Sequence, residues 1–105
     1  MSGPSITPPW GFAIVRGASM SPTLRPGDRV LLSYRREAQV GDVVLARFAD
    51  GTVVVKRVGE RLSSGWWLVS DAPAIGVDSR HRGPVPDADL LAVARVRIWP
   101  RPRRL

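Results

Sequence analysis

The sequence predicts a small, mainly β domain of twisted antiparallel strands that form a partly closed barrel. Three observations lead to this prediction. Apolar residues make up 44% of the 105 positions, which is enough for one folded core but not for two domains. Ten glycines and ten prolines separate short apolar runs, as expected for strands joined by turns. No segment shows a sustained helical period, so helix beyond a turn or two is not expected.

The expected strands follow one another along the chain. They cover residues 11–15, 29–34, 43–48, 52–58, 66–70 and 90–99. Asp50 and Gly51 stand between the third and fourth strands and predict a hairpin with a two-residue type I′ turn. Residues 70–86 are rich in turn formers and predict a long loop. We divide the chain into an N-terminal segment at 1–11, a folded domain at 12–100 and a basic, frayed tail at 101–105.

Composition excludes several kinds of site. The chain has no cysteine, which rules out a thiol nucleophile, a disulfide framework and a thiolate metal site. His81 is the only histidine, which argues against a multi-histidine metal centre. We therefore expect no metal and no cofactor.

The net charge of +7 raises the possibility of a nucleic-acid partner, because clustered arginines bind phosphates. The arginines are scattered between apolar residues, however, as on a solvated strand face, so nucleic-acid binding is not expected. No apolar stretch approaches the roughly 18 residues needed to span a bilayer, and the first ten residues lack the pattern of a signal peptide. If Met1 is the native start, the sequence predicts a soluble, cytoplasmic protein.

Lys56 is the only lysine of the chain, which also contains fifteen arginines. Side chains alternate along a strand, so Lys56 shares a face with Val54 and Val58, whereas Arg57 lies on the opposite face. A buried arginine would need a dedicated carboxylate, but a buried lysine can lose its proton, so we place Lys56 inward. A neutral lysine amine can act as a general base.

Ser19 is the candidate nucleophile. It follows the first expected strand and lies between Ala18 and Met20, in a stretch where Gly17 and Pro22 impose an irregular backbone. A serine hydroxyl needs a neighbouring base to become a good nucleophile, and a neutral lysine can supply one. Without such a partner, Ser19 would be interpreted as a turn residue that bonds local backbone.

The order of four segments resembles a known family. GASMSPTLRPGD, GDVVLARF, VVVKRV and SDAPAIGVDSRHRGPVP are similar to the ordered motifs of the type I signal peptidases (S26), which are Ser-Lys endopeptidases. The likeness runs from about Val15 to the end of the last strand, and it includes neither the membrane anchor nor the large inserted domain of the secretory enzymes. Among the branches, the chain looks most like the short soluble maturation proteases of nickel-type superoxide dismutase, with WW before the SD loop and the ending IWPRP.

The resemblance implies roles for individual residues of the 12–100 catalytic domain. Ser19 would be the nucleophile, with its backbone N–H in the oxyanion hole, and Lys56 would be the general base. Gly17 stands where some members supply a serine hydroxyl as a second oxyanion donor, so the hole is simpler here or is completed by another group. Met20 is a candidate for a substrate pocket, although core packing explains it equally well.

The resemblance also implies a supporting loop. Asp78, Ser79 and Arg80 match the DSR element of the family, and Asp71 matches the acid that opens the same loop. We interpret Asp71, Asp78 and Arg80 as a salt-bridged scaffold beside the site.

The chain departs from the family pattern in this loop. Ala72 replaces a usual asparagine, and Gly76 replaces a serine that commonly bonds the lysine. A water, a backbone carbonyl or Ser79 could therefore orient the lysine. His81 is the competing base, paired with Asp71 or Asp78, but its arginine neighbours favour a solvated surface residue.

Three functions follow from these observations. The first is a Ser-Lys endopeptidase that removes the N-terminal leader of a protein precursor, which the resemblance suggests is nickel-type superoxide dismutase. The second is another Ser-Lys peptidase role, either signal-peptide cleavage with a membrane partner or self-cleavage. Self-cleavage is disfavoured because only a short segment precedes Ser19. The third is a non-catalytic module that binds nucleic acid or protein through Trp66, Trp67 and the arginines. The sequence does not predict an oligomeric state.

Overall fold

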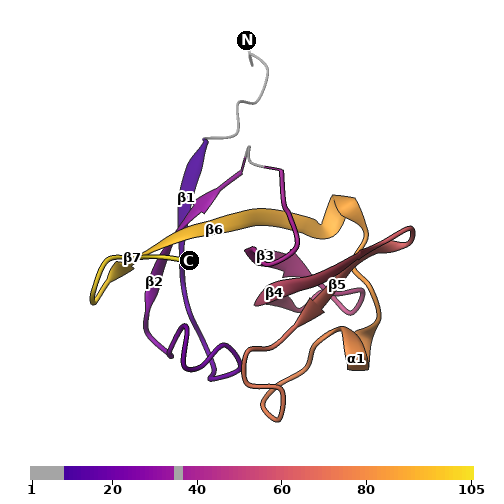
Figure 1. Cartoon of the computed structure of the whole chain (residues 1–105), viewed down its shortest axis with the longest axis horizontal. Coiled ribbons are helices and arrows are strands. Elements are labelled where there is room, and N and C mark those ends of the chain that lie inside the picture. Colours follow the sequence, from indigo (N-terminus) through magenta and orange to yellow (C-terminus); the bar gives the residue numbers. More distant parts are fainter. Residues whose placement is uncertain (1–8, 35–36) are drawn as a thin grey trace.

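The computed structural model describes residues 9–34 and 37–105. Its elements, shown in Figure 1, are β1 (Trp10–Ile14), β2 (Arg29–Ser33), β3 (Val43–Arg47), β4 (Val53–Leu62), β5 (Gly65–Val69), α1 (Ser79–Arg82), a 3₁₀ turn (Asp87–Asp89), β6 (Leu90–Trp99) and β7 (Arg103–Arg104). The prediction of a mainly β domain with very little helix is confirmed. All six expected strands are present, with ends shifted by a few residues.

The described strands form one antiparallel sheet of seven strands in the order β1-β2-β6-β3-β4-β5, with β7 paired to β6. β1 and β5 are the two ends of this order, so the sheet is not closed into a barrel. β6 runs from left to right across the view in Figure 1 and connects the β1–β2 pair with the β3–β4–β5 group. The candidate site lies between these two groups of strands.

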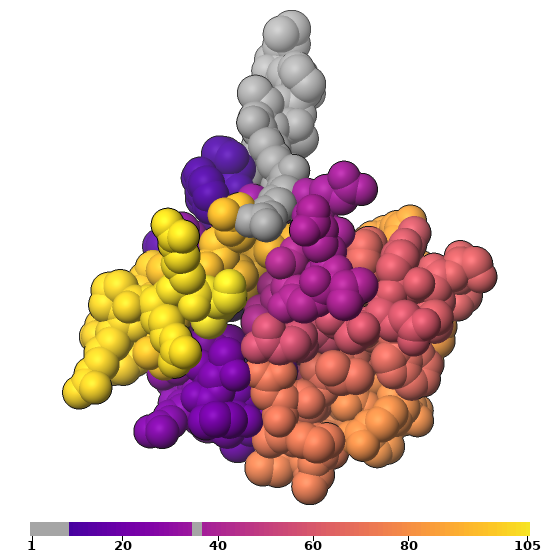
Figure 2. All heavy atoms as spheres, viewed as in Figure 1, coloured from indigo at the N-terminus to yellow at the C-terminus, as the bar shows by residue number. Residues whose placement is uncertain are grey.

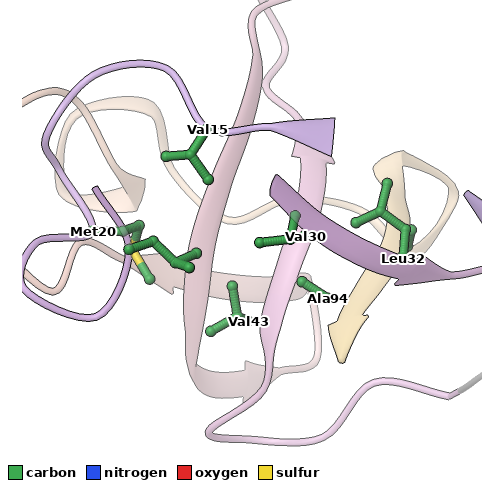
Figure 3. Close-up of a cluster of buried hydrophobic side chains, with 8 residues drawn as sticks. Val15, Met20, Val30, Leu32, Val43 and Ala94 are labelled. Carbon is green, nitrogen blue, oxygen red and sulfur yellow. The ribbon is translucent and has the colours of Figure 1, made fainter. Parts of the chain in front are cut away.

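Two apolar clusters fill the interior, one on each side of β6. Ala92 and Ala94 contribute to the first cluster with the β1–β2 half, and Val93 contributes to the second with the β3–β5 half. This alternation follows from the two-residue period of a strand. Figure 3 shows the first cluster, where Val15 and Met20 lie among side chains from β2, β3 and β6. The segment that carries Ser19 is therefore anchored in the core at both ends.

The predicted hairpin between β3 and β4 is present, but its predicted turn type is wrong. Arg47 pairs with Val53, and the N–H of Phe48 donates to the carbonyl of Thr52, which makes the connection longer than two residues. Gly51 has a φ of 89°, whereas Asp50 does not have the positive φ that a type I′ turn requires. Phe48 is only 2% exposed, so its burial extends the paired region and leaves the turn to the residues that follow.

Both ends of the domain differ from the expected boundaries. β1 begins at Trp10, inside the expected N-terminal segment, of which residues 1–8 lie outside the described part of the chain. The tail is not frayed, because Arg103 and Arg104 pair with β6 as β7. The N–H of Leu105 donates to the carbonyl of Arg95, and the Leu105 side chain packs against the first cluster. Packing of the apolar Leu105 thus holds residues 101–105 against the sheet, although their charge had suggested a free end.

Candidate active site

Ser19 lies in the connection between β1 and β2, and the residues around it are firmly held. Val15 bonds through its backbone to both Gly27 and Asp28, which closes the base of the loop. Met20, beside Ser19, is 1% exposed, and its carbonyl accepts from the N–H of Leu24, which is also fully buried. Burial of these two side chains places Ser19 where the loop leaves the core.

Lys56 lies on β4, opposite Val44 of β3, and points inward as predicted, with 3% of its surface exposed. Its Nζ is 2.7 Å from the Oγ of Ser19 and 3.1 Å from the Oγ of Ser70. In the ammonium form Nζ donates to both hydroxyls, and in the neutral form the Ser19 hydroxyl can donate to the amine lone pair. The structure therefore brings together the two residues that the sequence analysis paired, and adds a third.

The environment of Lys56 makes its amine easier to deprotonate than that of a surface lysine. Burial lowers the pKa of Lys56 below its ordinary value, while the Asp78 carboxylate acts in the opposite direction. Asp78 is the charged group that acts on this amine, and its own hydrogen bonds are directed to other partners. An amine that deprotonates more easily than a surface lysine can accept the proton of a neighbouring hydroxyl.

Asp78 is the most deeply buried acid of the site, with 1% of its surface exposed. One of its oxygens accepts from the N–H of Ser70, and the other accepts from the backbone N–H and Nε of Arg80. Burial acts to raise the pKa of Asp78, but the hydrogen bonds from Arg80 and Ser70 outweigh it and hold the pKa below the ordinary value. Asp78 also caps α1, so it connects this helical turn to the end of β5.

Asp71 does not pair with Arg80, contrary to the expected scaffold of three residues. Its carboxylate accepts two hydrogen bonds of 2.8 Å from Arg57 and a further one from Thr23. Hydrogen bonding from Arg57 lowers the pKa of Asp71, against the effect of burial. This group joins β4, the loop after β5 and the Ser19 loop, whose Ser19 carbonyl also accepts from the N–H of Ala72. Figure 2 shows the purple Ser19 loop in contact with the orange segment after β5.

Ser79 and His81 lie away from the dyad of Ser19 and Lys56. The Ser79 hydroxyl accepts from the N–H of Leu68, so it supports β5 and does not bond the lysine. His81 Nδ1 accepts from the N–H of Asp78 in the capping box of α1, and about half of its side chain is exposed. Within residues 9–34 and 37–105, neither residue bonds Ser19.

Gly76 lies directly against the dyad and has a φ of 74°. A Cβ added there would come within 3.2 Å of the Ser19 Cβ and 3.6 Å of Lys56 Nζ. The position that carries a serine in the resembled family thus faces the lysine here as well, but without a side chain. Ser70 supplies the hydroxyl instead, from a position that the sequence analysis did not select.

A cleft of about 580 Å³ opens beside the dyad. It is lined by residues 13–20, Leu45, residues 53–56 and residues 75–77, most of them apolar. Met20 contributes to this lining, although it is almost fully buried in the core. The cleft runs between β1 and the first half of β4, where Ile14 and Val53 are exposed.

Trp66, one of the two tryptophans proposed for a binding module, is engaged within the protein. Trp66 donates from Nε1 to Asp87 at 2.8 Å, and the Arg61 guanidinium lies 4.4 Å from its ring centre. Neither Trp66 nor Trp67 is among the large apolar side chains that are exposed in the described part of the chain. The Trp66 side chain is therefore already bonded within the protein.

Comparison with known proteins shows the family to which this β domain belongs. Residues 5–82 match the family described as Peptidase S24-like, which is more than half of the chain. The chain belongs to this family.

Two curated proteins extend the comparison. Mitochondrial inner membrane protease subunit 1 of Schizosaccharomyces pombe is 30% identical over 113 aligned positions, which cover 82% of this chain and 71% of that protein. Mitochondrial ATP-independent inner membrane protease subunit 1a of Arabidopsis thaliana is 34% identical over 115 positions, which cover 82% of this chain and 68% of that protein. In the part of this chain that the structure describes, no helix has both the length and the apolar character needed to cross a membrane.

Proposed function

We propose that this protein is a serine endopeptidase that uses Ser19 and Lys56 to remove an N-terminal leader from a protein precursor. The observation that carries the proposal is the 2.7 Å contact between Ser19 Oγ and a buried lysine amine at the edge of a peptide-sized cleft. Membership of a peptidase family makes peptide hydrolysis the reaction to expect.

The reaction proceeds in two halves. Ser19 Oγ attacks the carbonyl carbon of the scissile bond while its proton passes to the Lys56 amine. The resulting ammonium then protonates the leaving amine, the C–N bond breaks, and an ester on Ser19 remains. A water attacks this ester as Lys56 takes the water proton, and the collapse of the second intermediate returns the proton to Ser19. Each half begins and ends with a neutral lysine, which the burial of Lys56 favours.

The backbone N–H of Ser19 is the proposed oxyanion donor. It donates no hydrogen bond within the described residues, whereas the Ser19 carbonyl is occupied by Ala72. A free N–H beside the nucleophile can stabilise the charge that develops on the carbonyl oxygen in the transition state. Gly17 has a φ of 75°, and a Cβ added there would meet nothing within 4 Å, which leaves room at this point for the substrate backbone.

The cleft suits an extended peptide. Along residues 53–56, β4 pairs with β3 but lies beyond the reach of β5, and β1 pairs with β2 alone among the described strands. Both walls of the cleft thus have unpaired backbone edges that can bond to a strand-like substrate. Exposed Ile14, Val53 and Ile75 beside these edges favour apolar substrate side chains near the scissile bond.

The precursor that we propose is a nickel-type superoxide dismutase, which needs a free new N-terminus to bind its metal. The support is the resemblance of WW before the SD loop and of the ending IWPRP to the maturation proteases of that enzyme. This assignment also carries the expectation of a cytoplasmic enzyme that works without a cofactor.

The test is cleavage of a leader-bearing precursor of this dismutase by the purified full chain, with products identified by mass spectrometry. We expect one cut that releases the leader, and complete loss of cleavage in Ser19→Ala and in Lys56→Ala. Circular dichroism must show that both variants remain folded. Undiminished cleavage by the folded Lys56→Ala variant would contradict the mechanism.

A second candidate substrate is a membrane-delivered precursor with a presequence. The names of the two relatives, both inner membrane protease subunits, favour it. The same assay distinguishes the two candidate substrates. If the second is correct, a presequence peptide is cut and the dismutase precursor is not. Loss of Ser19 abolishes cleavage in either case, so the choice of substrate and the chemistry are tested independently.

A further inference from the structure

Ser70 directly follows β5 beside the dyad, and its hydroxyl is one of two groups that bond Lys56. The contact from Nζ to Ser70 Oγ is 3.1 Å, and Ser70 is 7% exposed. The two hydroxyls differ in their surroundings, because Ser19 lines the cleft and Ser70 does not. Ser70 is thus a buried polar contact on the protein side of the lysine, and Ser19 is the contact on the substrate side.

Ser70 itself is held in place by Asp78. Its N–H donates to Asp78 Oδ2 at 3.1 Å, and the other Asp78 oxygen is fixed by Arg80. Arg80 in turn donates to the carbonyl of Pro73, which holds the beginning of the same loop. The Ser70 hydroxyl is therefore presented to Lys56 from a rigid backbone rather than from a loose loop.

Position 76 cannot supply a hydroxyl to Lys56, because it is occupied by glycine. Its position faces Lys56 at a distance from which a side chain could reach the amine, yet it has no side chain, and its φ of 74° is unfavourable for any other residue. Ser79, the other serine of the loop, is bonded to the backbone of β5. In the described part of the chain, Ser70 is the one hydroxyl besides Ser19 that bonds the lysine amine.

We propose that Ser70 is the positioning residue that aims the Lys56 amine at Ser19. By accepting one N–H of the amine, Ser70 limits rotation about the last bond of the lysine side chain and directs the lone pair of the neutral amine toward the Ser19 hydroxyl. Ser70 does not line the cleft and acts through Lys56, and its role rests on the proposed function of the dyad.

The single lysine of the chain allows a direct test. Protein labelled with ¹³Cε-lysine gives one lysine signal, whose chemical shift against pH reports the Lys56 titration without any substrate. Removing the Ser70 hydroxyl takes an acceptor from the ammonium form, so in Ser70→Ala the Lys56 midpoint should move to lower pH. Asp78 acts on the same amine and is unchanged in this variant, because Ser70 bonds it through backbone N–H.

Activity supplies the second measurement. With a cleavable leader peptide, Ser70→Ala should lower kcat about tenfold with little change in KM, because the amine is misdirected while the cleft is intact. Ser70→Thr keeps a hydroxyl at the same position and should recover most of the rate and the wild-type titration midpoint. Ser79→Ala is the matched control, since it removes a buried hydroxyl of the same loop and should lower thermal stability without moving the midpoint.

The outcomes are separable. A Ser70→Ala protein with the wild-type midpoint and wild-type kcat would overturn the proposal, even if its thermal stability fell. A shifted midpoint with a reduced kcat that Ser70→Thr restores would support it. If the wild type cleaves no peptide, the proposed function fails, and the titration alone then decides whether Ser70 controls the lysine amine.

Discussion

Gly76 allows the geometry of the dyad to be tested with one added methyl group. A Cβ at this position would lie 3.2 Å from the Ser19 Cβ, which is closer than ordinary van der Waals contact. Gly76→Ala should therefore push Ser19 away from its position opposite Lys56. Gly51, in the turn between β3 and β4, offers the control, because its φ of 89° is also positive, yet a Cβ there meets nothing within 4 Å.

The expected magnitudes follow from these two environments. An alanine in the left-handed region costs roughly 1–2 kcal/mol, so both variants should lose thermal stability. At about 4–8 °C per kcal/mol for a domain near this size, Tm should fall by about 5–15 °C in each. A displacement of about 1 Å can reduce the rate about 10²-fold, so a shift of a few tenths of an ångström in Ser19 should reduce kcat/KM about tenfold in Gly76→Ala.

The assay compares kcat/KM for one leader peptide with Tm from thermal melts, in the wild type and both variants. We expect similar losses of Tm and a loss of kcat/KM confined to Gly76→Ala. Equal kcat/KM in the two variants would refute the reasoning, because it would mean that the space beside Ser19 does not limit catalysis.

Three further predictions concern the supporting structure. Asp71→Asn should destabilise the protein by about 1–3 kcal/mol at neutral pH, because it breaks the paired hydrogen bonds from Arg57. Arg57 lowers the folded-state pKa of Asp71 below its ordinary 3.8, so this stabilisation is present above that pH and is lost as the pH falls through the folded value. Urea melts of wild type and variant should therefore converge in acid, and a constant difference would argue against the ion pair. His81→Gln should leave the pH at which cleavage rises unchanged, since His81 serves the cap of α1; loss of that rise would identify His81 as the base. Met20→Ala should cost about 2–5 kcal/mol in denaturant melts, because Met20 is 1% exposed, and a cost below 1 kcal/mol would show that Met20 does not anchor the Ser19 loop.

Much of the fold could be predicted from sequence because the strand signal is local. Alternation in residues 52–58 correctly predicted that Lys56 faces inward and that Arg57 lies on the opposite face. The turn at Asp50 and Gly51 was placed correctly, but its type depends on how far pairing continues past the strand ends. How far the β3–β4 pairing continues depends on the burial of Phe48, which packs in a core made from distant segments.

Ser70 could not be identified from sequence because its place depends on a bulge. Near the tip of the β4–β5 hairpin, Leu62 pairs with Gly65, and the register shifts by one residue between Val58 and Glu60. Beyond the shift, Arg57 pairs with Val69, which places Ser70 rather than Asp71 across from Lys56. Without this shift an acid would face the lysine. A one-residue change in register is a tertiary effect that local patterns do not predict.

The partners of Asp71 were missed for a related reason. A buried Arg57 was expected to need a dedicated carboxylate, and the pairing of β4 with β5 brings Asp71 to it. Thr23 reaches the same carboxylate from a different loop, forty-eight residues away in the chain. These contacts form because the Ser19 loop folds back onto the end of β5. The composition and spacing of the sequence do not predict that arrangement.

The most direct test of the Ser-Lys mechanism compares two pH profiles of the wild-type protein. One is the ¹³Cε titration of Lys56, the single lysine, and the other is kcat/KM for a leader peptide. Because only the neutral amine accepts a proton, both profiles should share one midpoint, below the ordinary lysine value of 10.5, with activity rising as Lys56 deprotonates. A lysine that titrates at its ordinary value, or an activity profile that rises at a different pH, would contradict the assignment of Lys56 as the base.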